Sequence, residues 1–244
     1  MKSLEKQFNI VKKSKDPEEL NDFLIEIGKQ PRIEFLSFID YFIENCDPLL
    51  FQQVKLNLIY VLGEVGKLIK IHDNFISFLF KEYNNSDRWV RGEIISAFNK
   101  ISINVTLSNK IIELLGTALN EEYIPNSINA LNALYKLNTL PKTILRNIFN
   151  VFNSSNSEII ELSTAVLFKF VKNEEELFES LLQNGNYKIL KKNAIRSLLI
   201  IYFKSLSSIE SFSQKIFESK IESFHKEIFL KEIETYKRIL SKVL

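Results

Sequence analysis

The residue types that most often carry catalysis or bind metals are few in this sequence and stand far apart. Cys46 is the only cysteine, and the two histidines, His72 and His225, are separated by 225 − 72 = 153 residues. A zinc site needs several His, Cys or carboxylate ligands at about 2 Å from the ion, so we expect no metal. Cys46 and His72 are the one conceivable nucleophilic pair. Cys46 directly precedes the helix start Asp47-Pro48, where a small half-buried residue is ordinary, and we expect no catalysis there.

Phosphate-binding and acid–base patterns are also missing from the sequence. The six glycines form neither a Gly-x-Gly nor a Walker pattern, so no nucleotide or other cofactor is expected. Adjacent carboxylates occur at Glu121-Glu122 and Glu174-Glu175-Glu176, but neighbouring residues on a helix point in different directions. We interpret them as solvated faces and first-turn caps. These patterns favour a protein that is not an enzyme.

The composition is that of an ordered helical protein. Of the 244 residues 45% are hydrophobic and the net charge is only +2, which excludes a disordered acidic or basic tail. Six glycines and five prolines are too few for the many turns of a β-sandwich. The most apolar run, residues 197–203, is far shorter than the roughly 20 residues of a bilayer-crossing helix. The charged N-terminus lacks the apolar segment of a secretory signal, so we expect no transmembrane segment and a cytoplasmic location.

Helix start and stop signals divide the chain into helix-sized segments. Asp16-Pro17 and Asp47-Pro48 each combine a capping side chain with a proline at the first helical position. Between the breaks, apolar residues recur at spacings of three and four, as they do over residues 90–101. The predicted helices cover residues 2–14, 17–29, 32–45, 48–69, 72–84, 87–102, 106–121, 124–138, 141–153, 156–172, 174–183, 186–206, 208–219 and 221–243.

Two successive helices repeat together, which is the pattern of stacked supersecondary units. Leu62 and its neighbours align with Phe98 and its neighbours at an offset of 98 − 62 = 36 residues, and Leu134 follows Phe98 at the same offset. The preceding helix obeys this offset too, because Phe75 aligns with Ile111. Beyond residue 156 the register is no longer clear.

The stretch Asn84-Asn85-Ser86-Asp87-Arg88-Trp89-Val90-Arg91 resembles the HEAT-repeat (armadillo-like α-solenoid) family, whose unit is a helix A, a short turn with Asp, and a helix B that opens with Val-Arg. Residues 48–138 match best; the unit before has Lys55 for the Arg, and the unit after has Asn126-Ser127 for Val-Arg. The resemblance implies an all-α fold, a right-handed α-solenoid of about seven antiparallel helix pairs, as a single domain over residues 1–244. The alternative is an irregular helical bundle.

In the HEAT family the B helices line the inner, concave surface, so the resemblance and the repeat register together imply which residues face a partner. The set is amide-rich and mixed in charge, which suits hydrogen bonding to a protein better than neutralising a phosphate backbone. At least half of it is equally consistent with plain solvated surface. The predicted partner-binding residues are Gln53, Asn57, Tyr60, Glu64, Trp89, Glu93, Ser96, Lys100, Asn129, Asn132 and Lys136.

Two further features bear on binding. Trp89, flanked by Arg88 and Arg91, would be an interface anchor or a base-stacking platform if exposed; the alternative is packing over the turn of the neighbouring repeat. A basic cluster has spacings of three and four, which place its charges near one helix face. It is a possible patch for an anionic protein, nucleic acid or lipid, and otherwise ordinary surface. The basic cluster consists of Lys188, Lys191, Lys192 and Arg196.

These patterns favour a non-enzymatic protein–protein interaction scaffold or assembly subunit that binds an unidentified protein on its B helices. A nucleic-acid-binding protein is the alternative, because one group of DNA glycosylases also resembles a HEAT array. The balanced charge and the single Trp argue against that alternative, and no catalytic Asp can be mapped. A membrane-trafficking coat or adaptor component is a third reading, although no lipid anchor or polybasic run supports it.

Overall fold

The computed structural model describes residues 2–243, and the chain is 77% helical with no strand among those residues. The all-α class expected from the sequence is therefore confirmed. No helix over this range is long and apolar enough to cross a membrane. The helices of the described range are α1 (Lys2–Val11), α2 (Pro17–Lys29), α3 (Phe35–Asn45), α4 (Pro48–Gly66), α5 (Asp73–Asn85), α6 (Arg88–Ile101), α7 (Asn109–Ala118), α8 (Ile124–Lys136), α9 (Lys142–Val151), α10 (Ser157–Phe170), α11 (Glu174–Leu182), the 3₁₀-helix η1 (Gln183–Ile189), α12 (Lys192–Tyr202), α13 (Leu206–Glu218) and α14 (Ser223–Val243).

The chain divides into two compact units. The first comprises residues 1–111 and 123–136, and the second comprises residues 112–122 and 137–244. The boundary falls within α7, whose first residues belong to the first unit and whose later ones belong to the second. The single domain predicted over residues 1–244 stays a prediction.

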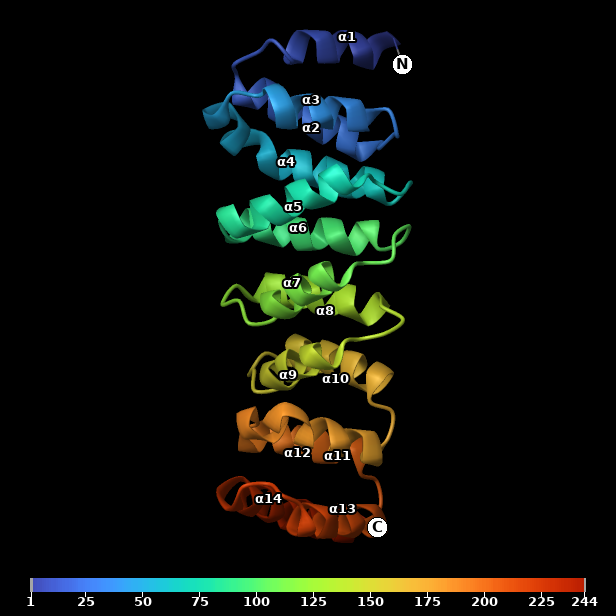
Figure 1. Ribbon diagram of the computed structural model, residues 1–244, viewed down its shortest axis with the longest axis vertical. Helices are drawn as coiled ribbons and strands as arrows, with labels where there is room; N and C mark the ends of the chain where they lie inside the picture. The colour runs from blue at the N-terminus through green and yellow to red at the C-terminus, as the bar shows by residue number, and fades with distance from the viewer. Residues whose placement is uncertain (1, 244) are drawn as a thin grey trace. The chain divides into compact units, whose positions relative to one another are not determined.

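In the first unit the even-numbered helices form one layer. α2 packs on α4, α4 on α6 and α6 on α8, while α1, α3 and α5 pack on α2, α4 and α6 respectively (Figure 1). The layer exists because one face of each helix is apolar: Ile59, Ile95 and Leu131 occupy the same position at the 36-residue offset and are all fully buried. Burial of this kind contributes roughly 25 cal/mol per Å² of apolar surface.

Capping side chains fix where the helices of this layer begin. The carboxylate of Asp47 accepts hydrogen bonds from the backbone N–H groups of Leu49 and Leu50 at 3.0 and 3.3 Å. Asp87 caps α6 in the same way, through Trp89 N and Val90 N, each at 3.0 Å. A cap of this type stabilises a helix by about 1 kcal/mol. The start predicted at Asp47-Pro48 is thus confirmed.

In the second unit α9 packs on α10 and on η1, α11 on η1, and α14 on both α12 and α13. Two buried tyrosines connect these elements through their hydroxyl groups. Tyr202 at the end of α12 donates to the carbonyl of Val171 at 2.8 Å, and Tyr236 in α14 donates to the carbonyl of Phe203 at 2.8 Å. Each bond satisfies a carbonyl that lies just beyond a helix end.

One predicted helix has a different start in the structure. The α-helix expected over residues 186–206 begins only at Lys192, and η1 precedes it. The reason lies at Leu190 and Lys191, whose backbone is extended with ψ 125° and ψ 164°. These two residues separate η1 from α12, so the α-helix cannot begin before Lys192.

Candidate partner-binding surface

The predicted partner-binding residues lie on α4, α6 and α8 of the first unit, and none of them is buried. The apolar residues between them on the same helices, such as Val61 and Ala97, are fully buried. Because α4, α6 and α8 pack side by side, the predicted positions form rows across neighbouring helices. The predicted residues are thus half-buried or exposed on this layer, and their binding of a partner stays a prediction.

Four residues of this set form a charged network between α4 and α6. The Lys100 ammonium lies 3.0 Å from Glu64 Oε1 and 3.2 Å from Glu93 Oε1, and 4.7 Å from the centroid of the Tyr60 ring. Lys67 adds a second ammonium, 2.6 Å from Glu64 Oε2. Two carboxylates and two ammonium groups leave no net charge, so this part of the surface is already satisfied by its own members.

The two carboxylates of the network have pKa values shifted in opposite directions. Burial favours the neutral form of Glu64, but the hydrogen bonds from Lys67 and Lys100 outweigh it and lower the Glu64 pKa below its ordinary value. For Glu93 desolvation by burial is the larger effect and raises the pKa, although Lys100 opposes it. The network thus contains one stabilised and one disfavoured carboxylate.

Amide side chains connect α2 to α4 at the same face. Asn57 Nδ2 donates to Asn21 Oδ1 at 2.8 Å, and Asn21 Nδ2 donates to the carbonyl of Gln53 at 3.3 Å. Asn57 is therefore engaged within the protein. Within the described part of the chain, by contrast, no hydrogen-bond or ion-pair partner contacts the side chains of four other predicted residues, which are Ser96, Asn129, Asn132 and Lys136.

Trp89 forms the most exposed cluster of the predicted face. Its side chain is 54% exposed and packs edge-on against Tyr123, with ring centroids 5.0 Å apart and an interplanar angle of 64°. The guanidinium carbon of Arg88 lies 5.2 Å from the centroid of each ring. The indole thus packs on the turn before α8 and still exposes more than half of its area, and its role as an interface anchor or base-stacking platform stays a prediction.

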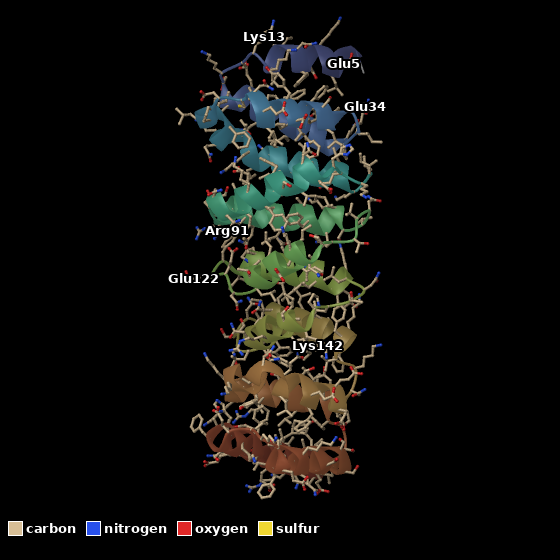
Figure 2. The ribbon with its side chains drawn as sticks, in the orientation of Figure 1. Glu5, Lys13, Glu34, Arg91, Glu122 and Lys142 are labelled. Atoms are coloured by element: carbon tan, nitrogen blue, oxygen red, sulfur yellow. The ribbon has the colours of Figure 1, made fainter. Side chains whose placement is uncertain are left out.

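The backbone beneath this aromatic cluster (Arg88, Trp89 and Tyr123) is held by side chains from two helices. Asp87 caps the first turn of α6, and Asn126 Nδ2 of α8 donates to the carbonyl of Arg88 at 3.2 Å. Arg91, labelled in Figure 2, donates from Nη1 to the carbonyl of Ser86 at 2.8 Å. The aromatic cluster is therefore presented on fixed backbone, which lowers the entropy lost when a partner binds.

The sequence pattern indicated Trp89 and its neighbour Arg88 but not their contact with Tyr123. Tyr123 follows Trp89 after 123 − 89 = 34 residues, close to the 36-residue offset of the sequence repeat. That spacing was a usable signal for the contact. The position of Arg88 over both rings depends on its rotamer, which the sequence does not show.

The structure does not gather the predicted basic cluster on one helix face. Lys188 lies in η1 and forms an ion pair with Glu222, while Arg196 in α12 holds the buried carboxylate of Glu232. These hydrogen bonds raise the pKa of Lys188 and of Arg196. The remaining two cations, Lys191 and Lys192, are exposed at the start of α12. Half of the basic cluster is therefore neutralised by carboxylates of the same unit.

The residues considered for nucleophilic chemistry lack the environment that activates a nucleophile. Cys46 is half-buried at the end of α3, and burial together with the charge of Asp47 raises the pKa of its thiol, whereas reactive cysteines have a lowered pKa. His72 directly precedes α5, as expected for a helix-start residue. Within the described range, no three His, Cys, Asp or Glu side chains come close enough to hold a metal ion.

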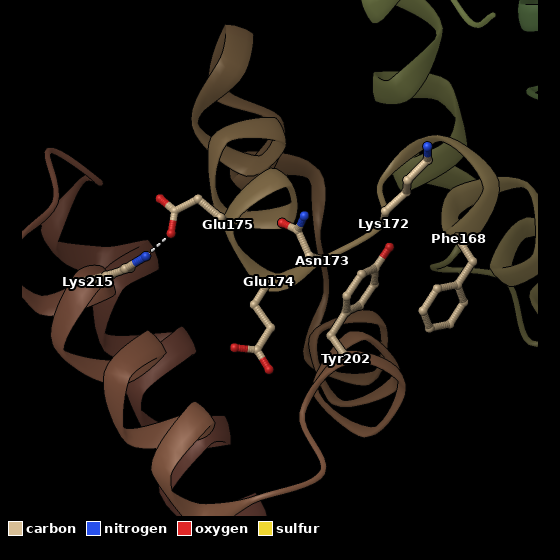
Figure 3. Close-up of a pocket in the computed structure, with 7 residues that line it drawn as sticks. All are labelled: Phe168, Lys172, Asn173, Glu174, Glu175, Tyr202 and Lys215. Atoms are coloured by element: carbon tan, nitrogen blue, oxygen red, sulfur yellow. Dashed lines mark hydrogen bonds and ion pairs between the residues drawn. The ribbon is translucent and has the colours of Figure 1, made fainter.

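The second unit contains a cavity of about 520 Å³ with balanced charges (Figure 3). One wall is aromatic, because the rings of Phe168 and Tyr202 stack with centroids 4.9 Å apart. On the other side Lys215 reaches Glu175 across the opening. Burial raises the pKa of Tyr202, with the charge of Glu176 adding to the effect, so its phenol stays neutral. The lining residues are Phe168, Lys172, Asn173, Glu174, Glu175, Tyr202 and Lys215.

The solved structures with a similar fold include two engineered proteins from the Northeast Structural Genomics Consortium. The first is 16% identical with a TM-score of 0.52, and the alignment covers 96% of this chain and 98% of that chain. The second is 14% identical with a TM-score of 0.51, covering 95% of this chain and 68% of that chain. At such identities the likeness shows the fold alone. No family model matches the sequence, and no curated protein matches it.

Proposed function

We propose that this chain is a HEAT-like α-solenoid scaffold, without catalytic activity, that binds a protein partner through the accessible face of α4, α6 and α8. The layer of even-numbered helices supports the solenoid, and so does the spacing of its polar contacts. Asn57 bonds Asn21 at a separation of 36 residues, and Arg196 bonds Glu232 at the same separation. Recurrence of one separation is the pattern of stacked repeats, each of which contacts its neighbours.

The single observation that carries the binding proposal is the aromatic cluster. Trp, Tyr and Arg are the three residue types most enriched at interface hot spots, and here they stand together with Trp89 54% exposed. The charged network and the Asn57 amide are already satisfied within the protein. The aromatic cluster is therefore the part of the face with the most binding energy left to offer.

A capture experiment with matched variants tests this proposal. Tagged wild-type protein and the Trp89→Ala variant are incubated with lysate of the source cells, with and without nuclease, and the bound proteins are quantified by mass spectrometry. Phe217→Ala serves as the control, because Phe217 is 67% exposed and lies in the second unit. We expect a stoichiometric protein that binds wild type and Phe217→Ala but is lost from Trp89→Ala.

The affinity for that protein, once purified, gives the quantitative result. A hot-spot side chain contributes at least about 2 kcal/mol, so Trp89→Ala should weaken binding by roughly 30-fold, and Tyr123→Ala or Arg88→Ala should weaken it as well. Equal capture by wild type and Trp89→Ala contradicts the proposed site. Capture that disappears with nuclease contradicts the protein partner and supports the nucleic-acid alternative, in which Trp89 stacks on bases.

A further inference from the structure

The second unit contains another cavity, at the junction of α9, α11, η1 and the end of α13. Its volume is about 760 Å³, within the roughly 300–1,000 Å³ of small-molecule sites. Unlike the cavity in Figure 3, it has unequal charges. It is lined by three cations and one carboxylate, together with aromatic and aliphatic side chains. We call it the η1 cavity.

Two of the three cations are available to a ligand. Lys188 is already paired with Glu222. Arg146 donates one hydrogen bond, from Nη1 to the carbonyl of Asn184 at 3.2 Å, which leaves most of its five N–H donors unused. Lys220 has no ion-pair partner within residues 2–243. The one lining carboxylate, Glu218, accepts a hydrogen bond from Gln214 and compensates only one of these charges.

The opposite wall of the η1 cavity is apolar and well supported. Phe178 packs edge-on against Phe212, with centroids 6.2 Å apart, and Tyr187 packs edge-on against His225 at 5.4 Å. Leu182 adds an aliphatic side chain that is 37% exposed. Such a wall gains free energy when a ring or an acyl chain covers it.

The backbone of η1 brings the two walls together. The left-handed residues Asn184 and Gly185 reverse the chain after α11, so Tyr187 and Lys188 line the same cavity as Leu182. A side chain at position 185 would meet Lys188, because a Cβ there would lie 3.3 Å from Lys188 Cε. The Arg146 hydrogen bond to Asn184 holds this turn against α9. The polar and apolar walls are thus in place before any ligand binds.

We propose that the η1 cavity binds a small organic anion, in which an aromatic or aliphatic body contacts Phe178, Leu182 and Tyr187 and a phosphate or carboxylate contacts Arg146 and Lys220. Both cations can donate charge-assisted hydrogen bonds to such a group, and the Arg146 fork can bind two oxygens at once. This proposal is independent of the partner-binding surface, which lies in the first unit.

Phenyl phosphate is the probe, with phenol and inorganic phosphate as its two halves. Each is titrated into the ¹⁵N-labelled full chain, and amide chemical shifts are followed by NMR. We expect saturable shifts for phenyl phosphate in η1 and residues 218–220, with an affinity at least about tenfold above either half, because each half engages only one wall. Equal affinities for phenyl phosphate and phenol, or saturable shifts confined to other regions, would overturn the proposal.

Two charge-reversal variants test whether phenyl phosphate binds in the η1 cavity or to surface charge in general. Lys220→Glu reverses one of the two available charges and should weaken the binding of phenyl phosphate by about tenfold. Lys231→Glu makes the same change in net charge at an exposed residue of α14 that does not line the cavity, and it should bind like wild type. Circular dichroism verifies that both variants fold. Equal weakening by both variants, or no effect of Lys220→Glu, contradicts the site.

Discussion

Lys55 in α4 and Arg91 in α6 stand 91 − 55 = 36 residues apart, and both contact Ser86. The Lys55 ammonium lies 2.8 Å from Ser86 Oγ and 3.4 Å from Glu82 Oε2, while Arg91 donates to the Ser86 carbonyl. Lys55 is 5% exposed and Glu82 7% exposed, so this ion pair is buried. Burying an ion pair has a large desolvation cost. The stability lost on mutation therefore depends on whether one or both partners are removed.

Replacing one partner of this pair should therefore be worse than replacing both. We expect Lys55→Met to lower the free energy of unfolding by about 3 kcal/mol, because it leaves the Glu82 carboxylate buried and uncompensated. The double variant Lys55→Met with Glu82→Leu should recover most of that loss. Urea denaturation of the three proteins measures the difference. If the single variant is as stable as wild type, the carboxylate is not held in a low-dielectric site.

The network at Lys100 predicts two opposite dependences on pH. The folded-state pKa of Glu64 is lowered, so its contribution to stability is present above the ordinary glutamate pKa and is lost as pH falls through the lowered value. The folded-state pKa of Glu93 is raised, so its contribution is lost as pH rises from the ordinary value to the raised one.

Neutral variants read out these two contributions separately. On acidification below the ordinary glutamate pKa range, the stability that Glu64→Gln lacks relative to wild type should shrink. As pH rises through that range, Glu93→Gln should become more stable relative to wild type. Denaturation midpoints measured from pH 3 to pH 7 check both, and parallel curves for the two variants would contradict the opposite shifts.

At the scale of the elements, α4 and α6 approach each other unusually closely at Gly63. A Cβ on Gly63 would lie 3.0 Å from the Ala97 Cα and 3.1 Å from the Ala97 Cβ. The obstacle is backbone of the facing helix, which cannot move aside as the end of a long side chain can. Glycine at position 63 therefore permits this close approach of the two helices.

Gly63→Ala should therefore destabilise the protein even though alanine is the better helix former. Helix propensity alone favours the change by about 1 kcal/mol, but overpacking against backbone typically costs about 1–3 kcal/mol, and we expect a net loss. Ser77→Ala in α5 is the control, because Ser77 is exposed and only propensity acts there. Thermal melting compares the two variants, and a melting temperature of Gly63→Ala above that of wild type would mean that α6 shifts without cost.

Helix positions were predictable from the sequence wherever a capping residue stands beside an apolar periodicity. Asp47 and Asp87 fixed the starts of α4 and α6 because the cap is a local interaction, encoded within four residues. The start of α12 was predicted wrongly because the extended backbone of Leu190 and Lys191 delays it to Lys192. The left-handed residues Asn184 and Gly185 do separate the two predicted helices, but sequence alone does not show that a 3₁₀-helix follows them.

At the scale of the molecule, the side chains that bridge elements far apart in the sequence were the hardest features to predict. Asn104 donates to the carbonyls of Gly66 and Lys67 at 3.0 and 2.7 Å, and Asn153 donates to the carbonyl of Ile189 at 2.8 Å. Such residues read as surface asparagines in the sequence. Their partners are backbone groups more than thirty residues away, which carry no residue type for a pattern to detect.

The proposed solenoid makes a distinct prediction about how damage spreads through the chain. In a repeat array each unit is stabilised by its own core and its nearest neighbours, so a core truncation should loosen adjacent helices and spare distant ones. Phe98 in α6 and Phe203 just after α12 are both fully buried, and they belong to different compact units. Truncation of a buried phenylalanine to alanine costs about 3–5 kcal/mol, enough to populate local opening.

Hydrogen exchange measured by mass spectrometry follows that opening helix by helix. Phe98→Ala should raise exchange in α4, α6 and α8 while α13 and α14 keep wild-type rates. Phe203→Ala should do the reverse, because Phe203 packs against Phe212 of α13 at a centroid distance of 4.6 Å and accepts the hydrogen bond from Tyr236 of α14. If either variant raised exchange equally in all these helices, the chain would unfold as one cooperative core, as an irregular helical bundle does, and the repeat interpretation would fail.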